Sequence, residues 1–141
     1  MTRCNRRLSF REAIALENAR SRLGVIVEIG ERLYVTKPAE FRKWLRRNHA
    51  TKTEIWLVQY KKATGKPSID YIQAVEEAIC YGWIDSFERG IDAERYATRF
   101  TPRRPRSSWT ATNKARARQL IAAGRMTAAG LKALPSDLRE P

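Results

Sequence analysis

Residues 54–62 (EIWLVQYKK) limit the folds open to this chain more than any other segment. They are rich in β-branched and aromatic residues, which favour extended backbone. The alternation of a strand places Ile55 and Leu57 on one face and Trp56 and Val58 on the other, so both faces are largely apolar. A strand that is apolar on both faces needs cover on both sides, as the inner strands of a sheet have. We therefore expect a sheet in which this segment is a central strand.

A helix is predicted over residues 38–48. Pro38 suits its first turn, where a backbone N–H would have no partner within the helix. Phe41, Trp44 and Leu45 then follow at the i, i+3, i+4 spacing and form one apolar face. This face should pack the helix against the sheet.

A second helix is expected between Asp70 and Gly82. Asp70 followed by Gln73 has the spacing of a capping box, and Gly82 can adopt the left-handed backbone that ends many helices. The alternating pattern over residues 83–100 predicts a β-hairpin, and a short strand is predicted over residues 32–36.

The last third of the chain begins with a loop over residues 101–108 (TPRRPRSS), because two prolines exclude an ordinary strand interior. Thr110 can cap a helix that runs to about Ala123, and Thr127 can start a final short turn that ends before Pro135. The order of elements favours an α+β fold: one compact domain with a small, mostly antiparallel sheet and helices packed on it.

A chain of 141 residues has the size of one domain. We divide it into a poorly defined N-terminal extension (residues 1–30), a folded domain (31–134) and a short C-terminal tail (135–141). Within the extension, residues 8–23 show a weak amphipathic helical pattern.

The chain is expected to be cytoplasmic. No stretch reaches the 18 or more apolar residues of a membrane span, so we expect no transmembrane segment, and no apolar region of a secretory signal follows the N-terminal arginines. Cys4 and Cys80 are far apart in sequence and fit neither a metal-binding pair nor a disulfide scaffold, so we expect reduced thiols.

The charge is strongly positive and unevenly distributed. There are 28 Lys and Arg against 15 Asp and Glu, which gives a net charge of +13. Residues 68–101 are nevertheless acidic, with 7 carboxylates against 3 basic side chains, and basic segments flank them. A positive excess of this size favours a polyanionic partner, and nucleic acid is one alternative.

The common enzyme and cofactor templates are absent from the sequence. There is one histidine, His49, no CxxC pair, no phosphate-binding glycine loop and no GxSxG motif. We therefore expect no cofactor and a non-enzymatic protein. The remaining enzymatic alternative is a pair of carboxylates, Asp85 and Asp92, that could converge across the hairpin for acid/base work.

Residues 103–109 (RRPRSSW), which we call the basic loop, offer the sharpest candidate site. Three guanidiniums and two hydroxyls precede the predicted start of a helix, where backbone N–H groups favour anions. Trp109, and Trp83 from the hairpin, adjoin this polar segment and could offer stacking faces. The alternative is that these arginines pair with the acidic middle segment and that Trp109 belongs to the core.

Several motifs together resemble a known family. They are EFRKWL, IWLVQYKK, AICYGWIDS (residues 78–86), Ile91-Asp92, RFTPRRPRSSWTATN (99–113) and LIAAGRMTAAG (120–130). In this order they resemble the YdeI/OmpD-associated, or bacteriocin-protection, family of small bacterial proteins. The resemblance covers about two thirds of the chain, and its members usually continue into a longer basic helical tail than residues 131–141 provide.

The resemblance implies a role in tolerance of bacteriocins or antimicrobial peptides and supplies no catalytic residues. Combined with the basic loop, it suggests a protein that binds an anionic small molecule or peptide. The motifs mark nine candidate ligand-binding residues: Trp83, Asp85, Asp92, Arg99, Arg103, Arg104, Ser107, Trp109 and Asn113.

Overall fold

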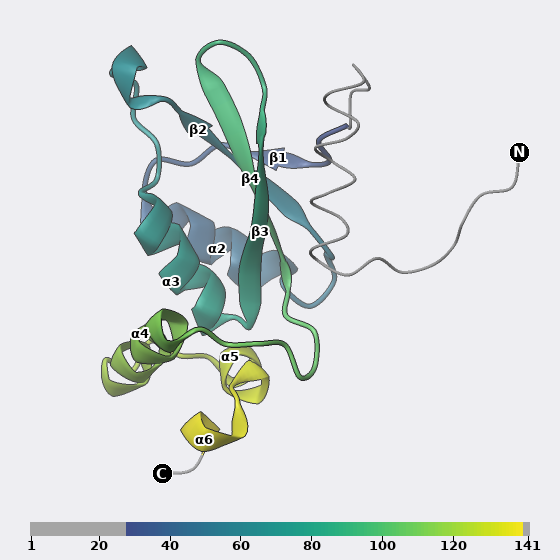
Figure 1. Cartoon of the computed structure of the whole chain (residues 1–141), viewed down its shortest axis with the longest axis vertical. Helices are drawn as coiled ribbons and strands as arrows, with labels where there is room; N and C mark the ends of the chain where they lie inside the picture. The colour runs from purple at the N-terminus through teal and green to yellow at the C-terminus, as the bar shows by residue number, and fades with distance from the viewer. Residues whose placement is uncertain (1–27, 140–141) are drawn as a thin grey trace, which may run out of the picture.

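A four-stranded sheet in the order β1-β2-β4-β3 lies at the centre of the computed structural model, which describes residues 28–139 (Figure 1). The strands are β1 (Arg32–Leu33), β2 (Ile55–Tyr60), β3 (Trp83–Gly90) and β4 (Arg95–Pro102). Only β1 and β2 pair in parallel; the other neighbours are antiparallel. The predicted small, mostly antiparallel sheet is confirmed, with β2 as an inner strand. The helix predicted over residues 8–23 lies outside the described residues.

The β3–β4 hairpin forms where the alternating pattern predicted it. Its turn is fixed by Asp92, whose Oδ1 accepts hydrogen bonds from the backbone N–H groups of Glu94 and Arg95 at 2.9 and 2.8 Å. The expectation that the loop starts at residue 101 was wrong, because β4 continues to Pro102, which pairs with Trp83. A proline is tolerated there because it is the last residue of its strand.

Two helices pack on the face of the sheet that carries Ile55 and Leu57. They are α2 (Pro38–Asn48) and α3 (Tyr71–Cys80), and a short 3-10 turn, η1 (Lys62–Thr64), follows β2. The predicted apolar stripe of α2 points inward, with the Phe41 ring 5.3 Å from that of Phe100 in an edge-to-face contact. Asp70 caps α3 by accepting the N–H of Gln73.

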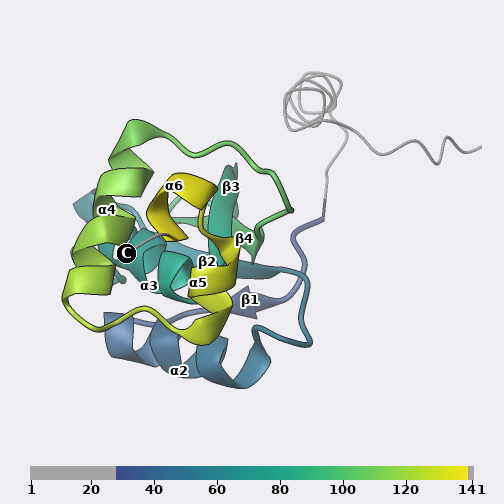
Figure 2. The ribbon, with the colours of Figure 1, turned by 90° about the horizontal axis from the view of Figure 1, so that it is seen from below.

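Three helices form a layer at one end of the molecule. They are α4 (Ala111–Ala122), α5 (Ala128–Ala133) and α6 (Ser136–Arg139), and Figure 2 shows them around the end of α3. Thr110 and Thr127 cap α4 and α5 as predicted. The four-residue α6 was not predicted, because one turn is too short to show a helical period. None of the helices in residues 28–139 is long and apolar enough to cross a membrane.

The GRMTAAG segment attaches this layer to the sheet domain. Gly124 has a φ of 70° and ends α4. Thr127 then donates two hydrogen bonds to the carbonyl oxygen of Cys80, from its N–H at 3.1 Å and from Oγ1 at 2.6 Å. At Gly130 the backbone approaches Cys80 so closely that a Cβ atom would overlap its carbonyl oxygen. These contacts fix α5 against the turn between α3 and β3.

Candidate anion-binding site

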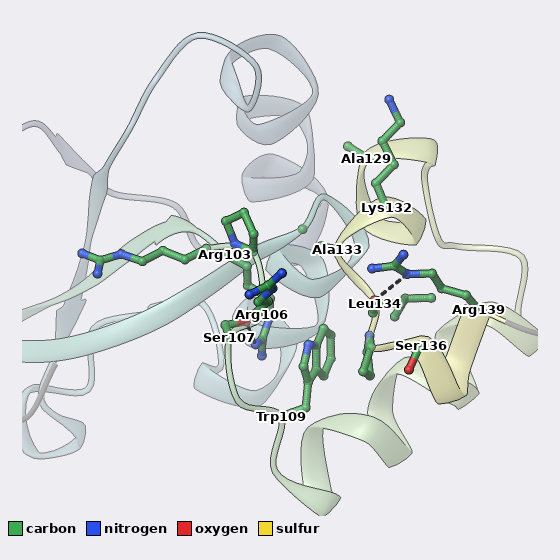
Figure 3. A pocket seen from close by; sticks show the side chains of 14 residues that line it. Arg103, Arg106, Ser107, Trp109, Ala129, Lys132, Ala133, Leu134, Ser136 and Arg139 are labelled. Atoms are coloured by element: carbon green, nitrogen blue, oxygen red, sulfur yellow. Dashed lines mark hydrogen bonds between the residues drawn. The ribbon is translucent and has the colours of Figure 1, made fainter. Parts of the chain in front are cut away.

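A pocket of about 640 Å³ lies between the basic loop and the segment that contains α5 and α6 (Figure 3). Gly82, in the turn that precedes β3, also lines it. The rest of the lining is of two kinds. Apolar groups come from α5 and the turn that follows it, such as Ala133 and Leu134, and the others are mainly basic side chains. The pocket therefore joins two segments that are distant in sequence.

Among residues 28–139, no acidic residue lines the pocket, and five basic side chains do: Arg103, Arg104, Arg106, Lys132 and Arg139. Within residues 28–139, none of these cations forms an ion pair with a carboxylate. Arg139 donates from Nε to the carbonyl oxygen of Leu134 at 2.8 Å, which holds it at the pocket wall. The pairing of the basic loop with the acidic middle segment, the alternative left open by the sequence, does not occur in this part of the chain.

Arg103 is the most unusual of the five. It is 9% exposed, and its guanidinium lies over the Trp109 ring, 3.7 Å from the centroid. Nη1 donates to Ser107 Oγ at 3.0 Å and to the Ser108 carbonyl oxygen at 3.2 Å. Nε and Nη2 are buried and have no acceptor among the described residues. The acceptors that Arg103 does have are neutral.

Burial lowers the pKa of the Arg103 guanidinium from 12.5 to about 10, and the charge on Asp85 opposes this shift. The side chain is therefore still a cation at neutral pH. A buried charge without a counter-ion costs free energy that a bound anion would recover. Because Nε and Nη2 are buried, the charge of Arg103 acts on the pocket through space. Arg104 and Arg106 line the pocket and are exposed, and their guanidinium groups have the geometry that matches carboxylate and phosphate oxygens bidentately.

The shape of the basic loop depends on Arg106, which has a φ of 62°. This left-handed conformation costs a non-glycine residue roughly 1 kcal/mol or more. It reverses the chain, so that the Ser107 N–H reaches the Arg104 carbonyl oxygen at 3.1 Å and Ser107 Oγ reaches Arg103. The turn thereby places three arginines on one wall of the pocket.

Four of the nine predicted site residues line the pocket: Arg103, Arg104, Ser107 and Trp109. Three of the other five have separate partners. Trp83 is a core residue, 1% exposed, with its ring edge-on to Trp44 at 5.7 Å. Arg99 donates from Nε to Glu54 at 2.6 Å, and Asn113 accepts from Arg116 at 2.8 Å. The first turn of α4 does not line the pocket either, so the expected contribution of its N-terminus is absent from the lining.

The two remaining residues, Asp85 and Asp92, do not converge, so the structure does not support the enzymatic alternative that the sequence left open for this pair. Asp85 faces Phe100 near the start of β3, whereas Asp92 lies in the turn at the far end of the hairpin. Asp85 accepts a 2.5 Å hydrogen bond from the Tyr71 hydroxyl, whose pKa is raised by burial and by this carboxylate. Asp92 pairs with Arg95, which lowers the pKa of Asp92 to about 2. They therefore cannot act as an acid/base pair on one substrate.

Sequence reasoning missed the second wall of the pocket, where Lys132, Ser136 and Arg139 lie. Residues 135–141 were predicted to be a tail, and no motif connects them with the basic loop. Their only signal was charge, because Lys132 and Arg139 add to the positive excess of the C-terminal segment. Their position follows from the docking of α5, which only tertiary contacts reveal.

Much of the described chain matches a known protein family. The family described as a domain of unknown function (DUF8412) matches residues 33–133. This range includes the basic loop and Lys132 and stops before Ser136 and Arg139. No curated protein and no solved structure matches the chain. The resemblance to the YdeI/OmpD-associated family stays a prediction.

Proposed function

Because the chain belongs to the DUF8412 family, a domain of unknown function, we propose its role from the pocket itself: a non-enzymatic protein that binds an anionic ligand between the basic loop and α5–α6. The observation that carries this proposal is the buried Arg103 guanidinium, which has only neutral acceptors among the described residues. An anion in the pocket would supply the missing counter-charge.

The arrangement around Arg103 supports binding over a purely structural role. Three arginines outside the pocket have carboxylate partners: Arg42 and Arg125 bind Glu77, and Arg99 binds Glu54. The cations of the pocket have none within residues 28–139. Unpaired cations that share one concave site repel one another, and a bound anion relieves that repulsion.

Isothermal titration calorimetry with citrate, inorganic phosphate and AMP tests the proposal. The variant Arg104→Gln/Arg106→Gln removes two exposed charges from the pocket wall, and Arg46→Gln/Arg47→Gln on the outside of α2 is its matched control. We expect at least one anion to bind, with affinity reduced about tenfold or more in the pocket variant and little in the control. Absence of binding to every anion, or equal losses in both variants, contradicts the proposal.

Nucleic acid is the second candidate, because residues 102–139 carry nine basic side chains and only one carboxylate. Binding of duplex DNA would weaken with salt, with a slope of about −0.9 per phosphate contacted. We compare retention on heparin for the α2 variant and the pocket variant. Equal losses of retention in both would favour nucleic-acid binding by the overall positive charge over binding in the pocket.

We also propose, from the family resemblance, a contribution to bacteriocin or peptide tolerance. A deletion strain complemented with the wild-type chain should survive a bacteriocin challenge better than one complemented with the Arg104→Gln/Arg106→Gln variant. Equal survival of the two complemented strains would contradict a role of the pocket in bacteriocin tolerance.

A further inference from the structure

We infer that the ligand of the pocket is a phosphate monoester with an apolar or aromatic body, such as a nucleoside monophosphate. This inference rests on the proposed function and specifies its ligand class. Three features of the pocket carry it: the number of cations, the hydrogen-bond donors around Ser107, and the apolar wall on the opposite side.

The charge of the pocket favours a dianion. In the part of the chain that the structure describes, five cations and no carboxylate line it, so a ligand with a single carboxylate would leave most of the positive charge uncompensated. A phosphate monoester carries about −1.5 to −2 at pH 7 and presents three acceptor oxygens. Arginine guanidinium groups match such oxygens bidentately, and Arg104 and Arg106 are the exposed arginines of the basic loop that line the pocket.

The hydroxyl of Ser107 is poised to donate. Its oxygen already accepts a hydrogen bond from Arg103 Nη1 at 3.0 Å, so its hydrogen is free for an acceptor in the pocket. Ser136 brings a second hydroxyl from the opposite wall. Donors on two walls suit a group with several acceptor oxygens better than a group with one.

The other part of the lining is apolar. Leu134 is buried at the base of the α5–α6 wall, and Ala129, Ala133 and Pro135 lie near it (Figure 3). Trp109 stands between this wall and the arginines. A volume of about 640 Å³ lies within the roughly 300–1,000 Å³ of pockets for small organic ligands. Inorganic phosphate would leave the apolar part of this space empty.

Four probes distinguish the contribution of the phosphate group from that of the aromatic part of the ligand. They are phenyl phosphate, benzenesulfonate, inorganic phosphate and benzyl alcohol, each titrated calorimetrically into the full chain. We expect phenyl phosphate to bind about tenfold or more tightly than each of the others. Its affinity should also rise by about tenfold from pH 5 to pH 7, because its second pKa is about 6, while that of benzenesulfonate should not change. The variant Lys132→Met, which leaves the basic loop intact, should reduce affinity for phenyl phosphate.

The outcomes distinguish this inference from the proposed function. Two results would contradict a phosphate monoester as the ligand and leave the proposed anion binding intact. Either benzenesulfonate binds as tightly as phenyl phosphate, or the affinity for phenyl phosphate does not depend on pH. If inorganic phosphate binds as tightly as phenyl phosphate, the inference that the ligand has an apolar or aromatic part is contradicted. If no anion binds, including citrate and AMP, both proposals fail. AMP that binds more tightly than both adenosine and inorganic phosphate supports a nucleotide as the natural form.

Discussion

The Arg103 guanidinium stacks on the Trp109 indole ring at 3.7 Å from its centroid, and both residues belong to one seven-residue loop. The stacking and the two hydrogen bonds to Ser107 and Ser108 hold a buried cation in place without neutralising it. The loop is therefore preorganised, since an incoming anion would not have to order this side chain.

Replacing Arg103 separates stability from binding. In Arg103→Met the stacking on Trp109 and the two hydrogen bonds are lost, but a flexible apolar side chain fills part of the space and the uncompensated buried charge disappears. These effects oppose each other, so the free energy of unfolding should change by less than about 1 kcal/mol. Affinity for phenyl phosphate should fall about tenfold or more. Urea denaturation and calorimetry measure the two quantities. A large loss of stability with unchanged affinity would make Arg103 a structural residue.

Glu77 should behave in the opposite way. It is 4% exposed and accepts hydrogen bonds from Arg42 at 3.0 Å and from Arg125 at 2.5 Å. Glu77→Gln leaves Arg42 without a carboxylate partner among the described residues and leaves Arg125 with only its 4.0 Å contact to Glu76, so it should cost roughly 2–3 kcal/mol in urea denaturation. Its neighbour Glu76, 4.0 Å from Arg125, is the control. Glu76→Gln should cost about 0.5 kcal/mol or less, and equal effects would refute the role given to Glu77.

The close approach at Gly130 predicts a large effect from one methyl group. A Cβ there would overlap the Cys80 carbonyl oxygen and would lie 2.6 Å from Met126 Sδ. Gly130→Ala should therefore push α5 away and destabilise the chain by roughly 1–3 kcal/mol, with weaker anion binding because one pocket wall moves. Gly90→Ala is the control, because no atom lies within 4 Å of its Cβ position. Equal melting temperatures of the two variants would contradict this packing.

Acid should weaken the hairpin through Asp92. Its pKa is lowered from 3.8 to about 2 by Arg95 and by the N–H groups of the turn. A lowered carboxyl pKa adds stability above pH 4, and this contribution is lost as the pH falls from about 4 to 2. Asp92→Asn should remove that part of the pH dependence. Thermal melts from pH 2 to 5 should show that the melting temperature depends less steeply on pH in the variant than in the wild type. Parallel curves of melting temperature against pH would contradict the role of Asp92.

Local signals predicted much of the fold, because each acts over a few residues. The alternation in residues 54–62 predicted an inner strand, and Thr110, Thr127 and Asp70 marked helix starts that the structure confirms. Two glycines have a local reason, because Gly82 and Gly124 adopt positive φ. Gly130 has a tertiary reason instead, because its lack of a side chain allows close packing against Cys80.

The sequence by itself determined the sheet, most of its helices and the basic loop, since periodicity, capping and proline placement are encoded within a few neighbouring residues. Only the tertiary structure decided the site. It paired Arg99 with Glu54, 45 residues away in the sequence, and buried Trp83 in the core. It also brought Lys132 and Arg139 opposite the loop. Such long-range placement depends on how α5 docks on Cys80, a packing event that no local pattern records.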